Sequence, residues 1–207
     1  MRITIIGAGK VGRALGSGWQ AQGHAISFGV RDPSSPKLAD IDRSRFSLGV
    51  TSVVAAGADV IVLATPWSGA QDAITSCGKL AGKIVLDATN PLLPKYAGMD
   101  HPGGKSGGAR VAEWAVDARV VKIFNTTGFG NMKDPRYGDR ASMMLYCGDD
   151  PDAKAIARDL AAALGFDPVD FGPLANAGLS ESFAMCWIWL AMNAGNGPDV
   201  AFTLNRR

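Results

Sequence analysis

A glycine motif near the start of the chain constrains the fold more than any other feature. The apolar run Arg2–Ile6 leads directly into Gly7-Ala8-Gly9-Lys10-Val11-Gly12, and a helical pattern begins inside this motif. In such a strand–turn–helix unit the first glycine permits a tight turn, the second lets the backbone approach a pyrophosphate, and the third allows close helix–strand packing. The pyrophosphate would lie at the helix N-terminus, on amide groups and the positive end of the helix dipole. We therefore predict a dinucleotide site here; the alternative is a glycine-rich turn without a ligand.

The rest of the chain alternates between apolar strand patterns and helical patterns. We expect strands at Arg2–Ile6, Ala25–Val30, Asp59–Ala64, Lys83–Ala88, Val120–Phe124 and Ser142–Cys147. This alternation indicates βαβ units and a parallel sheet covered on both faces. The predicted fold is α/β: a Rossmann-like, doubly wound, mostly parallel sheet with a small C-terminal α/β extension. We expect a dinucleotide-binding domain over residues 1–125 and a smaller part over residues 126–207, packed on it as one compact unit.

The end of the second strand bears on which dinucleotide is bound. An NAD site usually carries Asp or Glu there to bind the ribose hydroxyls, but this strand ends on Gly29 and Val30, and Arg31 follows. The missing carboxylate leaves room for the 2′-phosphate of NADP, and the Arg31 guanidinium would bind that phosphate through two hydrogen bonds. Alternatively, Arg31 is a surface residue paired with Asp32, or Asp32 binds the ribose of NAD. Further phosphate donors just beyond the arginine are Ser34, Ser35 and Lys37.

Small polar residues and prolines follow three of the later strands. In open parallel sheets, ligands bind outside the carboxyl ends of the strands, so these residues are expected to face the nicotinamide half of the cofactor. They are equally typical of ordinary turns. Three such ends on one sheet edge favour a shared pocket, with cofactor contacts predicted at Thr65, Pro66, Trp67, Asn90, Pro91, Asn125 and Thr126.

Composition excludes several classes of partner. The net charge of +2 indicates neither nucleic acid nor an anionic membrane surface. The three cysteines are far apart and suggest neither a metal site nor a disulfide framework. The first residues lack a basic leader, and the most apolar helical stretch, Phe183–Met192, is too short to cross a bilayer. We expect a reduced, cytoplasmic protein.

Two segments interrupt the alternation. Residues 91–108 form a long loop rich in glycine and proline, and such loops are usually functional or mobile. Its His101 is a possible proton donor, although a solvated loop histidine is the expectation. The apolar helix near the C-terminus has more apolar surface than a small domain normally hides, which favours a homodimer over a helix buried on its own sheet. Its Trp187 and Trp189 are expected in the core or in a dimer contact, and Cys147 is expected to be buried.

Several motifs together resemble a known family. The stretches "ITIIGAGKVG", "FGVRDP", "VLATPW", "DATNP", "VVKIFNTTGFGNM", "CGDD" and "GPLANAGLSESFAMCWIWLA" resemble the NADP oxidoreductases that depend on the deazaflavin coenzyme (coenzyme F-420). They are also similar to the NADP-binding domain of the six-transmembrane metalloreductases. The 2′-phosphate site of the family is typically Ser-Arg, where this chain has Val30-Arg31. The archaeal deazaflavin enzymes carry a histidine and a proline after the sixth strand; Asn125 and Gly128 stand here instead, as in the metalloreductase-like branch.

The resemblance implies a Rossmann domain that binds NADP, with a flavin-like partner stacked over the nicotinamide. The implied function is hydride transfer between NADP(H) and a small-molecule acceptor, a deazaflavin or FAD/FMN. The cofactors carry the chemistry, so no catalytic side chain and no metal is predicted. The alternatives are an NADP-binding redox sensor without turnover, a ferric reductase acting through flavin, and a reductase of imines or keto acids. The last group usually has a larger helical C-terminal domain.

Overall fold

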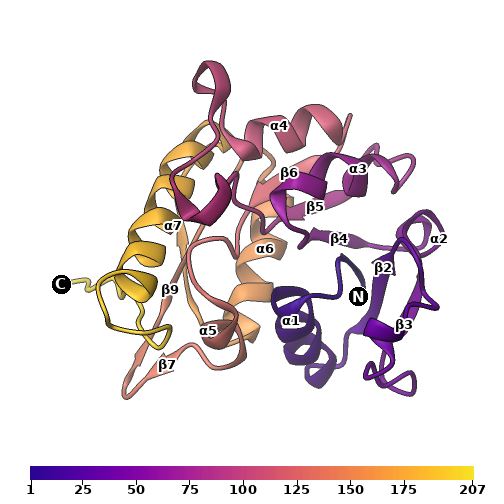
Figure 1. The fold of residues 1–207 in the computed structure, drawn as a ribbon, viewed down its shortest axis with the longest axis horizontal. Helices are drawn as coiled ribbons and strands as arrows, with labels where there is room; N and C mark the ends of the chain where they lie inside the picture. Colours follow the sequence, from indigo (N-terminus) through magenta and orange to yellow (C-terminus); the bar gives the residue numbers. More distant parts are fainter.

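Parallel strands of apolar residues form the centre of the molecule. The computed structural model describes all 207 residues and contains one eight-stranded sheet with helices on both faces (Figure 1). Only the contact between β6 and β9 is antiparallel. In spatial order the strands are β10 (Asp167–Asp170), β9 (Met143–Gly148), β6 (Arg119–Lys122), β5 (Ile84–Asp87), β4 (Val60–Leu63), β1 (Arg2–Ile6), β2 (Ala25–Val30) and β3 (Ser47–Val50). This arrangement confirms the predicted Rossmann-like fold.

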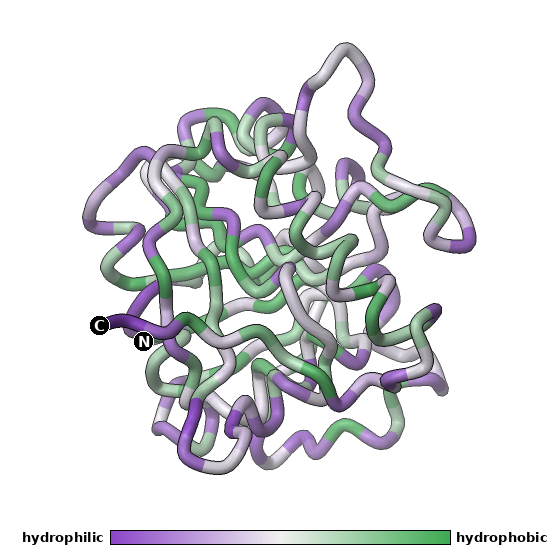
Figure 2. Tube along the Cα trace, turned by 90° about the vertical axis from the view of Figure 1, so that its left-hand side faces the viewer, coloured by the Kyte–Doolittle hydropathy of each residue, from purple (hydrophilic) through white to green (hydrophobic).

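Alternate residues of each strand enter two separate cores. Ile3 and Ile5 of β1 pack in the larger core under α1 (Lys10–Ala21), α5 (Phe129–Lys133) and α6 (Pro151–Ala163). Ile6 packs in the second core, under the remaining three sheet-covering helices: α2 (Thr51–Ala56), α3 (Ala70–Thr75) and α4 (Gly107–Trp114). Both faces are therefore apolar, which is why these strands read as continuous apolar runs. Figure 2 shows the same pattern, with hydrophobic stretches gathered in the interior.

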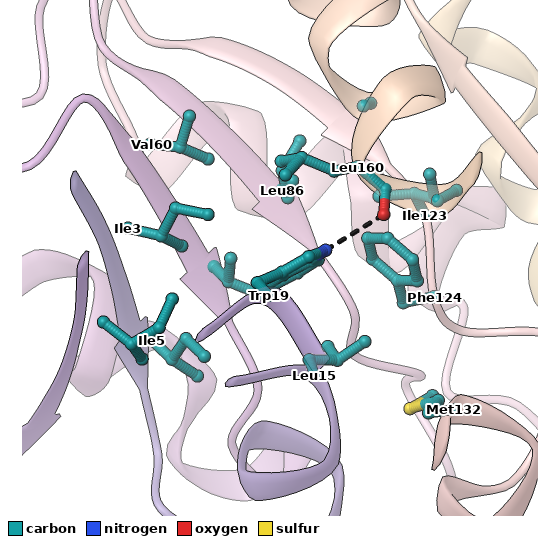
Figure 3. Close-up of a cluster of buried hydrophobic side chains, with 14 of the residues drawn as sticks. Ile3, Ile5, Leu15, Trp19, Val60, Leu86, Ile123, Phe124, Met132 and Leu160 are labelled. Atoms are coloured by element: carbon teal, nitrogen blue, oxygen red, sulfur yellow. Dashed lines mark hydrogen bonds between the residues drawn. The ribbon is translucent and has the colours of Figure 1, made fainter. Parts of the chain in front are cut away.

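The larger core joins the N-terminal and C-terminal parts of the chain. Trp19 of α1 is fully buried, and its indole N–H donates to the carbonyl of Leu160 in α6 at 2.9 Å (Figure 3). Its ring meets Phe124 edge-on, with 5.4 Å between ring centroids. Residues 126–207 thus extend the same sheet through β9 and β10 and share a core with residues 1–125.

The C-terminal part adds a long helix and a small hairpin. Helix α7 (Ala177–Met192) lies beside α4 and β9, and a two-stranded ribbon is formed by β7 (Arg136–Tyr137) and β8 (Arg140–Ala141). Five single turns of 3-10 helix connect other elements, at Pro36–Leu38, Trp67–Gly69, Pro94–Tyr96, Pro102–Gly104 and Leu174–Asn176. None of the helices combines the length and the apolarity that crossing a bilayer requires.

The sequence analysis missed the two outermost strands, β3 and β10. Their sequences, Ser-Leu-Gly-Val and Asp-Pro-Val-Asp, are short and only half apolar. Each forms an edge of the sheet, where one side of the strand needs no hydrogen-bonded partner and where proline is tolerated. Edge strands therefore lack the apolar run by which the inner strands were recognised.

Candidate functional site

The glycine turn lies at the carboxyl edge of the sheet, between β1 and α1, where the strand order reverses. A Cβ on Gly12 would lie 2.2 Å from the Gly7 carbonyl oxygen, and one on Gly7, whose φ is 107°, would lie 2.6 Å from the Ala64 oxygen. Packing alone therefore requires both of these glycines. A Cβ on Gly9 would meet no protein atom within 4 Å. Gly9 is the one glycine of the motif whose missing side chain leaves space that the protein does not use.

The N-terminus of α1 is open to a ligand. Gly9 is the N-cap residue and offers no side-chain cap, and the first turn carries no acidic residue. The amides of Lys10, Val11 and Gly12 donate to no backbone carbonyl. Unpaired amides at a helix N-terminus attract anions, and the helix dipole adds to the attraction. Arg13 stabilises the turn, because its guanidinium donates to the Ala8 carbonyl at 2.7 Å and pairs with Asp40.

A first cavity, of about 480 Å³, opens beside this turn; we call it the Arg31 cavity. It lies between the ends of β2 and β4 and is lined by Gly7, Gly29, Arg31 and residues of the segment that follows β4. Arg31 is exposed and takes part in none of the ion pairs or side-chain hydrogen bonds. Four further polar residues line this cavity and were not predicted from the sequence: Thr51, Ser68, Asp72 and Ser76.

The alternative considered for Arg31, a pair with Asp32, does not form. The Asp32 carboxylate instead accepts the amide of Ser34 at 2.9 Å and its hydroxyl at 2.5 Å. These hydrogen bonds hold the pKa of the Asp32 carboxyl below its ordinary value. Ser34 and Lys37 lie near the end of β2, but neither lines the cavity. Gly29 is also required by packing, since a Cβ there would lie 2.8 Å from the Ile6 side chain.

A second cavity, of about 750 Å³, lies at the ends of β4 and β5; we call it the Trp67 cavity. Trp67 and Trp114 form an aromatic wall of this cavity. The Arg110 guanidinium lies 4.7 Å from the centroid of the Trp67 ring and 5.5 Å from that of the Trp114 ring. The Arg110 side chain also pairs with Asp100 at 3.1 Å. The start of the long loop also lines this cavity, at Leu92, Leu93 and Pro94. The two cavities meet, because Thr65, Pro66 and Ser68 line both.

The Thr65 hydroxyl marks the junction of the two cavities. Its oxygen is the one buried side-chain nitrogen or oxygen atom in the protein that has no hydrogen-bond partner. Buried polar groups without a partner are rare in native proteins and call for an explanation, such as a missing ligand. The hydroxyl therefore fits a ligand that spans both cavities.

The other predicted contacts at this edge come together and also make hydrogen bonds or packing contacts within the protein. The amide of Asn90, which lines the Trp67 cavity, donates to the Asn125 carbonyl at 2.7 Å and accepts from the Asn125 amide at 3.1 Å. Phe124, just before Asn125, has a φ of 62°, which few non-glycine residues adopt. Pro91 is buried, and a Cβ on Gly107 would lie 3.0 Å from its ring. Thr126 is buried as well, with its hydroxyl against the Met144 sulfur.

The sequence analysis missed a buried group of charges behind the Trp67 cavity. Lys122 of β6 is fully buried, and its ammonium lies 2.9 Å from Asp87 of β5 and 2.9 Å from Glu181 of α7, both also fully buried. Burial lowers the pKa of Lys122, but the charges of the two carboxylates outweigh it and raise the pKa above its ordinary value. Burial raises the pKa of Glu181, but the Lys122 charge and the hydrogen bonds from Lys122 and two backbone amides outweigh it, so the pKa lies below its ordinary value. All this favours a charged Lys122–Glu181 pair at neutral pH.

His101 belongs to this charged group, so the expectation of a solvated loop histidine is wrong. Its Nε2 lies 2.7 Å from a Glu181 carboxylate oxygen. Of the two tryptophans expected in the core or in a dimer contact, Trp187 is buried and Trp189 is 60% exposed. Cys147 is buried as expected, and burial raises the pKa of its thiol to about 12, so it is not a nucleophile at neutral pH.

Comparison with known proteins agrees with this geometry. Residues 2–91 match the model of the family described as NADP oxidoreductase coenzyme F420-dependent. The chain is related to these NADP oxidoreductases. It is also 28% identical over 177 residues to Metalloreductase STEAP3 of Rattus norvegicus, a match that covers 85% of this chain and 35% of that protein. The chain thus spans about a third of the length of this relative.

Solved structures extend the likeness to the whole chain. A proposed F420-dependent NADP reductase from Arthrobacter sp. FB24 is 29% identical, with a TM-score of 0.89 and full coverage of both chains. A hypothetical protein from Sinorhizobium meliloti is 28% identical, with a TM-score of 0.77 over 100% of this chain and 96% of that one. A reductive aminase from Aspergillus terreus, at 19% identity and a TM-score of 0.66 over 94% of this chain and 62% of its own, shares the fold. The findings support an NADP-dependent oxidoreductase.

Proposed function

We propose that the chain transfers hydride between NADP(H) and a deazaflavin or flavin-type acceptor. The observation that carries the proposal is the uncapped N-terminus of α1, with free amides beneath open space at Gly9. The Arg31 cavity has room for an adenosine, and Arg31 would meet the 2′-phosphate at its rim. Gly9, Lys10, Val11 and Gly12 would hold the pyrophosphate. The Thr65 hydroxyl would meet the nicotinamide half where the two cavities join.

The protein's part in this chemistry is to hold and orient. When bound, a reduced nicotinamide supplies the hydride and a flavin-type ring accepts it. The Trp67 cavity lies beyond Thr65 and would take the acceptor ring against its aromatic wall. Holding both partners in adjoining cavities would bring the reacting atoms together without an acid–base residue. Asn90 and Asn125 would keep the ends of β5 and β6 together beneath them.

An NADPH oxidation assay tests the acceptor. With purified protein, we expect the absorbance of NADPH to fall when a deazaflavin, FMN or FAD is added. We expect ferric chelates to be reduced only when a flavin is also present. The Gly9→Ala variant serves as the control: at NADPH concentrations below its weakened affinity it should oxidise NADPH more slowly with every acceptor. Tight binding of NADPH without oxidation by any of these acceptors would contradict turnover and favour the redox sensor.

The preference for NADP rests on Arg31. A bidentate, charge-assisted contact with the 2′-phosphate contributes on the order of 1.5–3 kcal/mol, or roughly tenfold to a hundredfold in affinity. Arg31→Ala should weaken NADPH binding by about that factor and leave NADH binding nearly unchanged, as measured by calorimetric titration. Arg158→Ala, which removes an exposed arginine from α6, is the matched control. Equal binding of NADH and NADPH by the wild type would instead point to NAD.

We also propose a homodimer formed through α7. Three of its large apolar side chains are about 60% exposed, Leu179, Trp189 and Met192, and its one charged residue, Glu181, is buried. Apolar surface of this kind is typical of an interface. Light scattering at micromolar concentration should give the mass of two chains for the wild type and of one chain for Trp189→Glu. Val53→Glu, at an exposed position of α2, should remain dimeric. A monomeric wild type would rule out the dimer.

A further inference from the structure

The Glu181 carboxylate gathers three elements around one buried point. One of its oxygens accepts from the Lys122 ammonium at 2.9 Å and from the Gly108 amide at 2.9 Å. The other accepts from the Gly107 amide at 3.0 Å and contacts His101 Nε2 at 2.7 Å. The glycines make this approach possible, because a Cβ on Gly107 would lie 2.9 Å from the carboxylate. Glu181 thus connects α7 to β6, to the first turn of α4 and to the long loop.

One carboxylate oxygen of the buried charged group can accept a hydrogen bond from the loop. Asp87 and Glu181 bring two negative charges, and Lys122 brings one positive charge. The second oxygen of Asp87 accepts the amide and the hydroxyl of Thr89, at 2.9 and 2.7 Å. The second oxygen of Glu181 has only the Gly107 amide besides His101. His101, with 24% of its side chain exposed, is therefore the one contact that joins this buried group to the outer part of the loop.

The same stretch of loop forms part of the Trp67 cavity. Asp100, next to His101, lines the cavity and pairs with Arg110, the guanidinium of the aromatic wall. The Asp100 amide donates to the Pro91 carbonyl at 2.6 Å, and the Leu93 amide donates to the Gly98 carbonyl at 2.9 Å. These bonds join Gly98 and Asp100 to the start of the loop, where Leu92 and Leu93 line the cavity. A displacement of His101 would therefore shift the residues of the loop that line the cavity and Asp100, the partner of Arg110.

We propose that His101 is a positioning residue for the electron acceptor: through Glu181 it holds residues 92–100 in place as the wall of the Trp67 cavity. The inference rests on the proposed function, which assigns the acceptor to that cavity. His101 acts through Asp100 and Arg110, and it does not line the cavity itself. The Arg31 cavity and the first turn of α1 include no residue of the loop. Loss of the contact should therefore weaken acceptor binding and leave NADPH binding unchanged.

A titration with FMN, followed by tryptophan fluorescence in the presence of NADP⁺, tests this role. His101→Ala should bind FMN roughly tenfold more weakly than the wild type, as for the loss of a hydrogen bond to a charged group. His101→Gln should bind FMN within about threefold of the wild type, because a glutamine amide can place its nitrogen near the position of Nε2. Lys105→Gln, at an exposed position of the same loop outside residues 92–100, is the control. In turnover, the alanine change should raise KM for FMN more than it lowers kcat.

Two results separate this inference from the proposed function. Equal FMN affinities in all variants, or a parallel loss of NADPH affinity in His101→Ala, would overturn the positioning role alone. Absence of FMN and deazaflavin binding by the wild type would overturn the acceptor site. Hydrogen exchange at the Leu93 and Asp100 amides then reports on the loop directly. Faster exchange in His101→Ala and wild-type exchange in His101→Gln would support the hold on the loop, and unchanged exchange in both would overturn it.

Discussion

The close contact between the first turn of α1 and the end of β1 determines where a ligand can bind. Because Gly12 has no side chain, α1 begins against the carbonyl of Gly7, at the edge of the sheet where the strand order reverses. Any side chain at Gly12 would push the helix away from the strand and move its free amides. The packing that builds the larger core therefore also places the free amides of α1 next to Gly7, which lines the Arg31 cavity. The packing of α1 and the proposed pyrophosphate site thus share the same residues.

A second constraint acts at the other end of the sheet edge. Lys122 can lie in the core only because Asp87 and Glu181 neutralise it, and removing one partner of such a group leaves a buried charge uncompensated. The group fixes β5, β6, α4 and α7 relative to one another. Asn90 follows β5 and Arg110 lies in α4, so the Trp67 cavity depends on buried charge, whereas the Arg31 cavity depends on glycines and backbone.

Local patterns predicted what local physics determines. The inner strands, the glycine turn and the missing carboxylate at the end of β2 could all be recognised from runs of a few residues. The edge strands could not, since half-exposed strands carry little apolar signal. The roles of Asn90, Asn125 and Thr126 were also beyond the sequence, because a polar residue after a strand can face a ligand or a neighbouring strand. Their spacing along the chain is the same in either case.

The charged group was not predicted because its members are far apart in the sequence, at positions 87, 122 and 181. A signal was nevertheless present. Lys122 stands within the apolar stretch Val-Val-Lys-Ile-Phe, and Glu181 is the one charged residue of a long apolar helix. Charged residues at core positions are almost never left without a partner. Searching for such isolated charges and pairing them by sign would have connected Lys122 with Asp87 and Glu181, though not with His101, which lies in an irregular loop.

The affinity of the Gly9→Ala variant for NADPH tests the central claim most directly. The backbone of Gly9, with a φ of −80°, suits alanine, and the new methyl group would meet no protein atom. The loss of stability should therefore be about 1 kcal/mol or less, as for a change of N-cap residue. If a pyrophosphate lies over this turn, the methyl group should weaken NADPH binding by at least about tenfold, a loss of roughly 1.4 kcal/mol. Unchanged NADPH affinity in a folded Gly9→Ala variant would contradict the proposed site.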